Sequence, residues 1–226
     1  ELIISKTQGL TYEDLLSSYN KININSINNG DVVALIGDFD PQSIAYLFKL
    51  IDKKCVVVPL TKETKNEHDY FFENSQVDWI IQDNKIIKYT TDANNKNKHS
   101  LLNHLNELNH AGLVLFSSGT SGKPKAILHD LEPFFNRYIN ANKELTTLSF
   151  LLFDHIGGLN TFFYSFFAGS KIIFPEERNP KYIWDLIEEY KVELLPTSPT
   201  FLRLSKASVN FELLNLESLK LVTFGT

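Results

Sequence analysis

The most constraining feature of the sequence is a strand–helix–strand order near its beginning. The run DVVALIG at 31–37 is apolar and β-branched, which is typical of a strand buried on both faces. The segment DPQSIAYLFKLIDKK at 40–54 follows, with Asp40 as a helix cap, Pro41 in the first turn and apolar residues recurring on one face. CVVVPL at 55–60 supplies the next strand. Because strands joined through a helix usually pair in parallel, this order predicts an α/β fold of mainly parallel sheets flanked by helices.

The same alternation continues along the chain. Period-3.6 stripes predict helices, and short β-branched runs bounded by polar residues predict strands. We expect helices at 11–22, 65–74 and from Asn179 to Tyr190, another over Phe134–Ile139, and strands at 78–82, 111–118, 125–130, 146–153, 191–199 and 218–226. The polar stretch TTDANNKNKHS at 90–100 has no period, so we interpret it as a solvated loop that divides the chain into two lobes.

Charge and cysteine content exclude some classes of function. The net charge of −5 gives no general attraction to nucleic acid or to anionic lipid, so any anion site must be local. Cys55 is the single cysteine, so no intrachain disulfide can form, and we expect a buried filler residue in a reducing compartment. With no secretory signal at its beginning, the chain is expected to be cytoplasmic.

One apolar segment, 148–168, is long enough to suggest a membrane helix. Asp154, His155 and Asn160 lie near its middle, where polar and charged groups are costly in lipid, so we expect no membrane span. The sequence contains no Met, neither at its start nor elsewhere, and stops within an apolar run, so we expect a fragment of a longer protein.

The stretch FSSGTSGKPKAIL at 116–128 is the strongest candidate for a binding site. Its glycines allow backbone angles at which successive N–H groups converge on one anion, and its hydroxyl and lysine side chains add donors and charge. A flexible surface turn remains an equal alternative at this point, since the same residue types are common in turns. The Walker pattern is absent because Pro124 follows Lys123, which disfavours an ordinary P-loop NTPase.

The longer stretch LVLFSSGTSGKPKAILHD resembles the phosphate-binding signature of the adenylate-forming superfamily, which includes acyl- and aryl-CoA synthetases, luciferases and adenylation domains. Other stretches occur in the family's order, namely LTYEDLL and GDVVALIG before the loop, and FDHIGGLNT, LLPTSPTFLRL and LKLVTFGT after it. The resemblance covers nearly the whole chain. It departs at Ala126, where many relatives have glycine, and at Thr226, where the sequence stops.

The resemblance implies a two-step reaction. A carboxylic acid attacks ATP to give an acyl-adenylate and pyrophosphate, and the acyl group then passes to a thiol of CoA or of a carrier protein's phosphopantetheine, with Mg²⁺ as metal. It further implies phosphate binding by the loop, a cationic role for a lysine and contact with adenine by a late glycine. The implied ATP-binding residues are Ser117, Ser118, Gly119, Thr120, Ser121, Gly122, Lys125 and Gly225.

By the same resemblance, residues 1–226 are the first part of the family's N-terminal AMP-binding domain. The metal-associated glutamate, the ribose-binding aspartate, the hinge and the C-terminal lid with the catalytic lysine would all lie beyond the end of the sequence. We therefore expect these residues alone to be inactive.

His155 bears on the substrate. Amino-acid-activating relatives place an aspartate in this motif to hold the substrate ammonium, whereas here His155 aligns with the histidine of acyl and aryl relatives and Asp154 lies one residue early. The resemblance thus implies a fatty or aryl acid without an α-amine, and a role in fatty acid metabolism. A hydrogen-bonded core histidine, with Asp154 as a turn cap, stays open as an alternative. The phenylalanines at 162, 163, 166 and 167 are expected to pack the core rather than line an acyl tunnel.

Other functions also stay open. They are a catalytically silent nucleotide- or acyl-binding module, an amino-acid adenylation domain, and an unrelated doubly wound protein whose glycine loop is only a turn.

Overall fold

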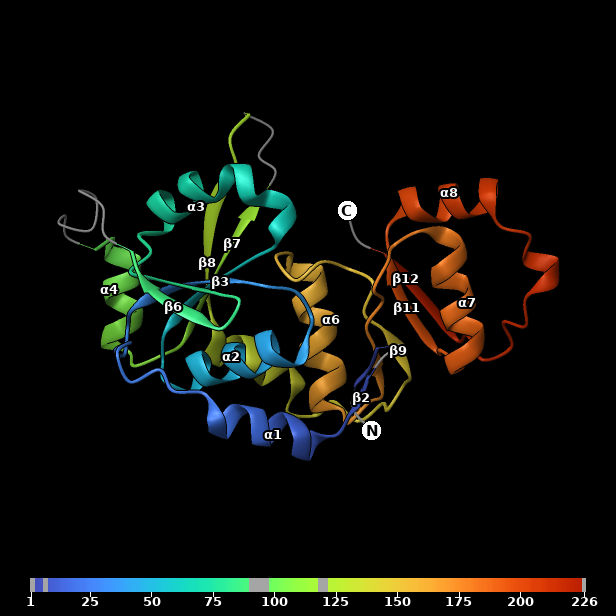
Figure 1. Cartoon of the computed structure of the whole chain (residues 1–226), viewed down its shortest axis with the longest axis horizontal. Coiled ribbons are helices and arrows are strands. Elements are labelled where there is room, and N and C mark those ends of the chain that lie inside the picture. Colours follow the sequence, from blue (N-terminus) through green and yellow to red (C-terminus); the bar gives the residue numbers. More distant parts are fainter. Residues whose placement is uncertain (1–2, 6–7, 90–97, 118–121, 225–226) are drawn as a thin grey trace. The chain divides into compact units, whose positions relative to one another are not determined.

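The computed structural model describes residues 3–5, 8–89, 98–117 and 122–224. The chain forms two compact units, the first made of Glu1–Glu13, Tyr138–Leu152 and Ile156–Thr226 and the second of Asp14–Arg137 and Phe153–His155. Each unit contains a six-stranded sheet with helices packed on it (Figure 1). The sequence suggested a division near 90–100. The elements on both sides of that stretch belong to the second unit, and residues 90–97 lie outside the described part.

The sheet of the second unit is mainly parallel. Its strand order is β6-β5-β3-β4-β7-β8, in which β5, β3, β4 and β7 run in parallel and the two edge strands are antiparallel to their neighbours. The strands are β3 (Val32–Ile36), β4 (Val56–Leu60), β5 (Trp79–Gln82), β6 (Lys85–Lys88), β7 (Gly112–Ser117) and β8 (Lys125–Asp130).

Helices cover both faces of this sheet, with α2 on one face and α3 on the other (Figure 1). Every residue of β3 and β4 is buried, which explains why these strands are apolar without alternation. The core on the α3 face joins alternate residues of β3 and β4 to Phe71 and Phe72 of α3 and to Leu105 of α4. The helices are α2 (Pro41–Asp52), η1 (Lys62–Glu67), α3 (His68–Ser75), α4 (Ser100–Glu107) and α5 (Leu131–Phe135), followed by η3 (Asn136–Tyr138); α1 (Tyr12–Lys21) leads from the first unit into the second.

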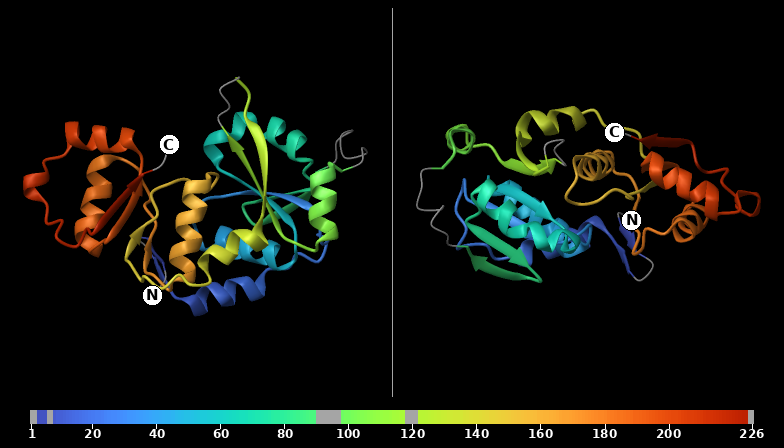
Figure 2. Two further views of the ribbon diagram at one scale, coloured as in Figure 1. Left: turned by 180° about the vertical axis from the view of Figure 1, so that it is seen from behind. Right: turned by 90° about the horizontal axis from the view of Figure 1, so that it is seen from above.

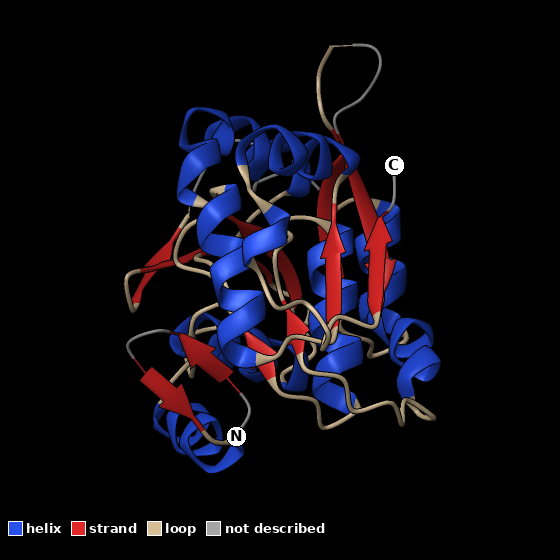
Figure 3. Cartoon of the chain, turned by 90° about the vertical axis from the view of Figure 1, so that its right-hand side faces the viewer, coloured by secondary structure: helices blue, strands red, loops and turns tan. Residues whose placement is uncertain are grey.

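The sheet of the first unit has the order β12-β11-β9-β10-β1-β2, with all pairs parallel except β1 with β2. β12 is the edge strand next to the C-terminal end and runs parallel to β11 (Figure 3). Trp184 and Ile187 of α7 and Phe201 of α8 pack with strand residues in its core. The elements are β1 (Ile3–Ser5), β2 (Gln8–Leu10), β9 (Thr147–Leu148), α6 (Ile156–Phe167), β10 (Ile172–Ile173), α7 (Pro180–Tyr190), β11 (Leu194–Thr197), α8 (Pro199–Ser208), η4 (Phe211–Leu213) and β12 (Leu221–Phe224).

The predicted α/β class with mainly parallel sheets is confirmed. Asp40 caps α2 as expected, since its carboxylate accepts hydrogen bonds from the backbone N–H groups of Gln42 and Ser43. The strand predicted at 146–153 is much shorter, and the helix expected over Phe134–Ile139 ends early in a 3₁₀ turn that leaves Ile139 exposed. Among the described residues, no helix has the length and apolar character needed to cross a membrane.

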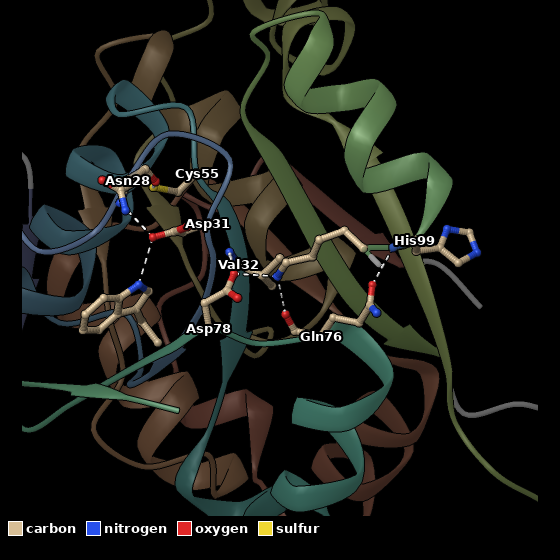
Figure 4. A network of polar contacts seen from close by, with 9 residues as sticks. Asn28, Asp31, Val32, Cys55, Gln76, Asp78 and His99 are labelled. Carbon is tan, nitrogen blue, oxygen red and sulfur yellow. Dashed lines mark hydrogen bonds and ion pairs between the residues drawn. The ribbon is translucent and has the colours of Figure 1, made fainter. Parts of the chain in front are cut away.

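A network of polar contacts ties the amino-terminal ends of the second unit's strands together (Figure 4). The Asp78 carboxylate accepts from the backbone N–H of Val32 at 2.8 Å and from Nζ of Lys98 at 2.6 Å. Asp31 accepts from the backbone of Asn28 at 2.7 Å and from the Trp79 indole at 2.9 Å. These contacts fix the ends of β3 and β5 relative to each other.

Cys55 lies beside this network and is fully buried. Its thiol contacts the backbone carbonyl of Asn28 at 3.4 Å. Burial, reinforced by the negative charge of Asp31, raises the pKa of the Cys55 thiol to about 12. The prediction of a buried filler cysteine is therefore confirmed, and the thiol is uncharged near neutral pH.

We predict that ionisation of Cys55 makes stability fall at high pH. In the unfolded chain a cysteine ionises near pH 8.5, about three units below the folded value, so above about pH 9 the folded state binds more protons and stability falls as pH rises. Urea denaturation at about pH 7 and about pH 10 should show wild type losing about 1–2 kcal/mol more than Cys55→Ala. Equal losses in the two proteins would contradict the raised pKa.

Candidate functional site

The predicted phosphate loop connects the two strands of a hairpin at the sheet edge (Figure 2). Strands β7 and β8 pair in antiparallel register, which sets Ser117 opposite Lys125 at the base of the loop. Lys125 is exposed, and it forms no ion pair within the described ranges. Five of the predicted ATP-binding residues lie outside the described residues: Ser118, Gly119, Thr120, Ser121 and Gly225.

The described end of the loop has the backbone geometry that the sequence suggested. Gly122 has a φ of +101°, a conformation that favours glycine, and apart from its two chain neighbours no described residue has an atom within 4 Å of the place where a Cβ would be. Its backbone is thus open to an approaching ligand. The structure places Ser117, Gly122 and Lys125 in one hairpin, which is compatible with an anion site at its tip.

Helix α3 anchors the base of the loop in this hairpin. The Tyr70 hydroxyl donates to the carbonyl of Pro124 at 2.9 Å, and Nζ of Lys123 lies 5.4 Å from the centre of the Tyr70 ring. The ring of Phe71 stacks on Phe116 of β7 with centroids 4.1 Å apart. The sequence predicted helix α3 but not this contact, because no local pattern links residue 70 to residue 124.

His155 lies at the surface rather than in the core. Its side chain is 60% exposed, which rules out the alternative of a hydrogen-bonded core histidine. The neighbouring Asp154 has only 9% of its side chain exposed, and its Oδ1 lies 3.8 Å from Nε2 of His155. Asp154 is not a turn cap either, since its Oδ2 accepts from the hydroxyl of Thr61, 93 residues earlier, at 3.1 Å.

The buried histidine of this region is His68, at the start of α3. Its Nε2 lies 3.0 Å from the carbonyl oxygen of Thr61, and the hydroxyl of Thr64 donates to the same carbonyl at 3.1 Å. Thr61 is 1% exposed. The backbone of Thr61, whose hydroxyl contacts Asp154, is therefore held by two contacts.

A cavity of about 120 Å³ brings these features together. The base of the loop contributes Ser117 and Pro124 to one wall of the cavity, and a second wall contains Asp154 and His155. The remaining lining residues come from the end of β4, from η1, from α3 and from β7: Pro59, Leu60, Thr64, Glu67, Phe71 and Phe116. The predicted loop and the predicted substrate histidine thus share one cavity, although they are far apart in the sequence.

A larger cavity of about 400 Å³ lies at the carboxyl ends of β3 and β5 and contains none of the predicted site residues. Its charged lining consists of Asp38, Asp40, Glu63 and Asp83 with one cation, Lys62, which pairs with Asp83 at 3.0 Å. A wall with this excess of negative charge does not suit a phosphate ligand, so we place the candidate site in the smaller cavity. No group of three or more His, Cys, Asp or Glu side chains within the described ranges could hold a metal ion.

The start of α6, directly after His155, approaches the preceding loop closely. A Cβ added to Gly158 would lie 2.0 Å from the carbonyl oxygen of Leu152, a backbone atom, whereas one added to Gly157 would meet only the end of the Leu151 side chain at 3.0 Å. Of these two positions, only 158 requires a glycine because the backbone approaches it closely. On the same helix Phe162 and Phe163 are fully buried, so core packing is confirmed for these two, while Phe167 is 45% exposed.

Comparison with known proteins identifies the family. Residues 5–226 match the family described as AMP-binding enzyme. The chain belongs to this family. The predicted resemblance to the adenylate-forming superfamily is thereby confirmed, and the alternative of an unrelated protein with a glycine turn is wrong.

Relatives of this AMP-binding chain include two curated enzymes. It is 27% identical over 153 residues to luciferin 4-monooxygenase of Photuris pensylvanica, covering 63% of the chain and 28% of that protein. It is 25% identical over 186 residues to 2-succinylbenzoate–CoA ligase of Listeria monocytogenes, covering 75% of the chain and 39% of that protein.

A solved structure shares the fold. It is the o-succinylbenzoate CoA synthetase of Bacillus subtilis in complex with its acyl-adenylate intermediate, with a TM-score of 0.74 and 18% identity over 99% of the chain and 64% of that structure. The chain thus spans less than two thirds of the length of each of these relatives.

We predict that Gly158→Ala destabilises the protein by more than Gly157→Ala. The first change forces a methyl group into a backbone carbonyl and requires the helix start to shift, whereas the second is relieved by rotation of a leucine side chain. Thermal denaturation should show a loss of about 1–3 kcal/mol for Gly158→Ala and about 1 kcal/mol or less for Gly157→Ala. Equal stability of the two variants would contradict the close approach.

Proposed function

We propose that this chain forms the nucleotide- and acid-binding part of an enzyme that activates a carboxylic acid with ATP to give an acyl-adenylate. The observation that supports this most is the shared cavity, in which the end of the glycine-rich hairpin lies beside Asp154 and His155. An anion-binding loop next to a pocket for an acid is the arrangement that such a reaction requires. Membership of the AMP-binding family points to the same chemistry.

In this proposal, the loop binds the phosphates of ATP. The backbone at Gly122 is open, Ser117 offers a hydroxyl at the loop's base, and Lys125 supplies an exposed positive charge. Donors held in place before reaction stabilise the negative charge that builds on the leaving pyrophosphate. Ser118, Gly119, Thr120 and Ser121 are proposed to take part by resemblance.

The acid is proposed to bind at His155, and the acyl group is then passed to the thiol of CoA or of a carrier protein. We favour a fatty or aryl acid, because the exposed side chain at this position is an imidazole rather than a carboxylate. Mg²⁺ is expected from the resemblance, but the described residues offer no cluster for it, so we derive no step through the metal.

One observation favours a second candidate, an enzyme that activates an acid bearing an amino group. Asp154 lines the same cavity, and its buried Oδ1 has no hydrogen-bond partner in the part of the chain that the structure describes. A buried carboxylate offsets the cost of burying an ammonium. The two candidates differ only in the acid, so they can be separated by substrate preference.

We predict that Lys125→Ala weakens ATP use in the natural protein. A contact between a charged side chain and phosphate is typically worth about 1.5–3 kcal/mol, so kcat/KM for pyrophosphate release should fall about ten- to hundredfold. Lys123→Ala is the matched control, since Lys123 lies over the Tyr70 ring, and it should lower the rate about threefold or less. Unchanged pyrophosphate release in Lys125→Ala would count against the assigned loop.

We also predict that fatty or aryl acids release pyrophosphate faster than α-amino acids. A panel of fatty, aryl and α-amino acids, assayed with ATP and the natural protein, tests this directly. The physical reason is that the exposed side chain at this position is the His155 imidazole, which offers no negative charge to a substrate ammonium, whereas the Asp154 carboxylate is largely buried. Preference for an amino acid would favour the second candidate, and no release with any acid would overturn acid activation.

A further inference from the structure

The Asp154 carboxylate is buried but only half satisfied. Oδ2 accepts the hydroxyl of Thr61 at 3.1 Å, whereas Oδ1 is buried and has no hydrogen-bond partner among the described residues. Buried acceptors in folded proteins are nearly always paired, and leaving one unpaired costs about 1–3 kcal/mol. A contact that served stability alone would be expected to satisfy both oxygens. The free oxygen therefore points to a partner that arrives with the ligand or moves when it binds.

His155 is a partner of this kind. Its Nε2 lies 3.8 Å from Oδ1 of Asp154, which is too far for a hydrogen bond. A small movement of the ring would bring the two atoms within hydrogen-bond distance. The His155 side chain is 60% exposed, so its ring has room to move. Asp154 and His155 line the cavity that also contains Ser117. A ligand bound in this cavity would contact the His155 ring and move it toward the Asp154 carboxylate.

Thr61 is the fixed point of this arrangement. It follows β4 directly and is 1% exposed. Its carbonyl oxygen is contacted by Nε2 of His68 at 3.0 Å and accepts the hydroxyl of Thr64 at 3.1 Å, so the backbone at Thr61 is held from the side of η1 and α3. The Thr61 hydroxyl donates to Oδ2 of Asp154 and so orients Oδ1 toward His155.

We infer that Thr61 is a positioning residue, which acts through Asp154 to fix the His155 imidazole against the bound acid. The inference rests on the proposed function, because the acid is the ligand that His155 would meet. In the complex, Nε2–H of His155 donates a hydrogen bond to Oδ1 of Asp154, and the ring is held in one orientation toward the acyl group. Without the Thr61 hydroxyl, the carboxylate turns and the imidazole loses its support.

The test compares Thr61→Val with Thr61→Ser and with Ser75→Ala in the natural protein. Valine keeps the shape of threonine but removes the hydroxyl, and serine retains it. Ser75→Ala is the matched control, because Ser75 is 3% exposed and its hydroxyl donates within α3 to the carbonyl of Phe71 at 2.5 Å, away from Asp154. The probes are benzoyl-sulfamoyl-adenosine, a stable mimic of an aryl-adenylate, and AMP, which lacks the acyl part.

Calorimetry should show that Thr61→Val weakens binding of the acyl mimic about five- to fiftyfold, as expected for loss of a contact to a charged group. Binding of AMP should change about twofold or less in the same variant, and Thr61→Ser and Ser75→Ala should bind both probes within about threefold of wild type. A loss confined to the acyl mimic and rescued by serine is not produced by general destabilisation.

A double-mutant cycle decides whether Thr61 acts through His155. In a His155→Ala background, Thr61→Val should have no further effect on the acyl mimic. An undiminished effect in that background would show that Asp154 contacts the ligand directly, and it would overturn the inference. Wild-type affinity for the mimic in Thr61→Val would do the same while leaving the proposed function intact, whereas failure of the natural protein to bind either probe would overturn both.

Discussion

Parallel pairing of β4 with β7 is the constraint on which the candidate site depends. Val56 pairs with Gly112 and Val57 with Leu113, so both strands run in the same direction and end at the same edge of the sheet. Thr61 follows the end of β4, and Ser117 is the last residue of β7. Ligands of parallel α/β sheets bind at the carboxyl ends of the strands, because the connecting loops gather there. The direction of the strands therefore sets the position of the cavity, independently of which side chains line it.

The hairpin formed by β7 and β8 is anchored at the base of its loop and is open at Gly122. Stacking of Phe71 on Phe116 and the hydrogen bond from Tyr70 to Pro124 attach its base to α3. At Gly122, in contrast, no described residue beyond its chain neighbours has an atom near the position of a Cβ. A binding loop that is anchored at its base loses less freedom when it closes on a ligand than one that is loose throughout.

The central part of the fold could be predicted because its signals are local. Continuous apolar runs predicted β3 and β4, and Asp40 with Pro41 predicted the start of α2. The sequence missed β1, β10 and β6, which are short or exposed, and α4, which follows a polar stretch. Strands β1 and β10 pair with each other across most of the sequence, whereas β6 pairs with the adjacent β5 through a tight turn whose Asp83 and Asn84 both have positive φ.

The same division holds for the site. The glycine-rich loop and His155 could be proposed from the sequence as site residues, since motif and resemblance both point to them. The contact between Thr61 and Asp154 spans 93 residues, and the burial of Asp154 beside an exposed His155 reverses what residue type alone suggests for the pair. Burial and pairing of this kind are set by tertiary packing, which no local pattern records.

The burial of Cys55 also gives the chain a practical property. A chain whose single thiol is buried and uncharged near neutral pH reacts slowly with thiol-directed dyes. A new cysteine at an exposed place such as Lys123, beside the loop, would then carry one fluorophore at a known position. Fluorescence from that dye would report directly on events at the hairpin tip while the rest of the molecule stays unlabelled.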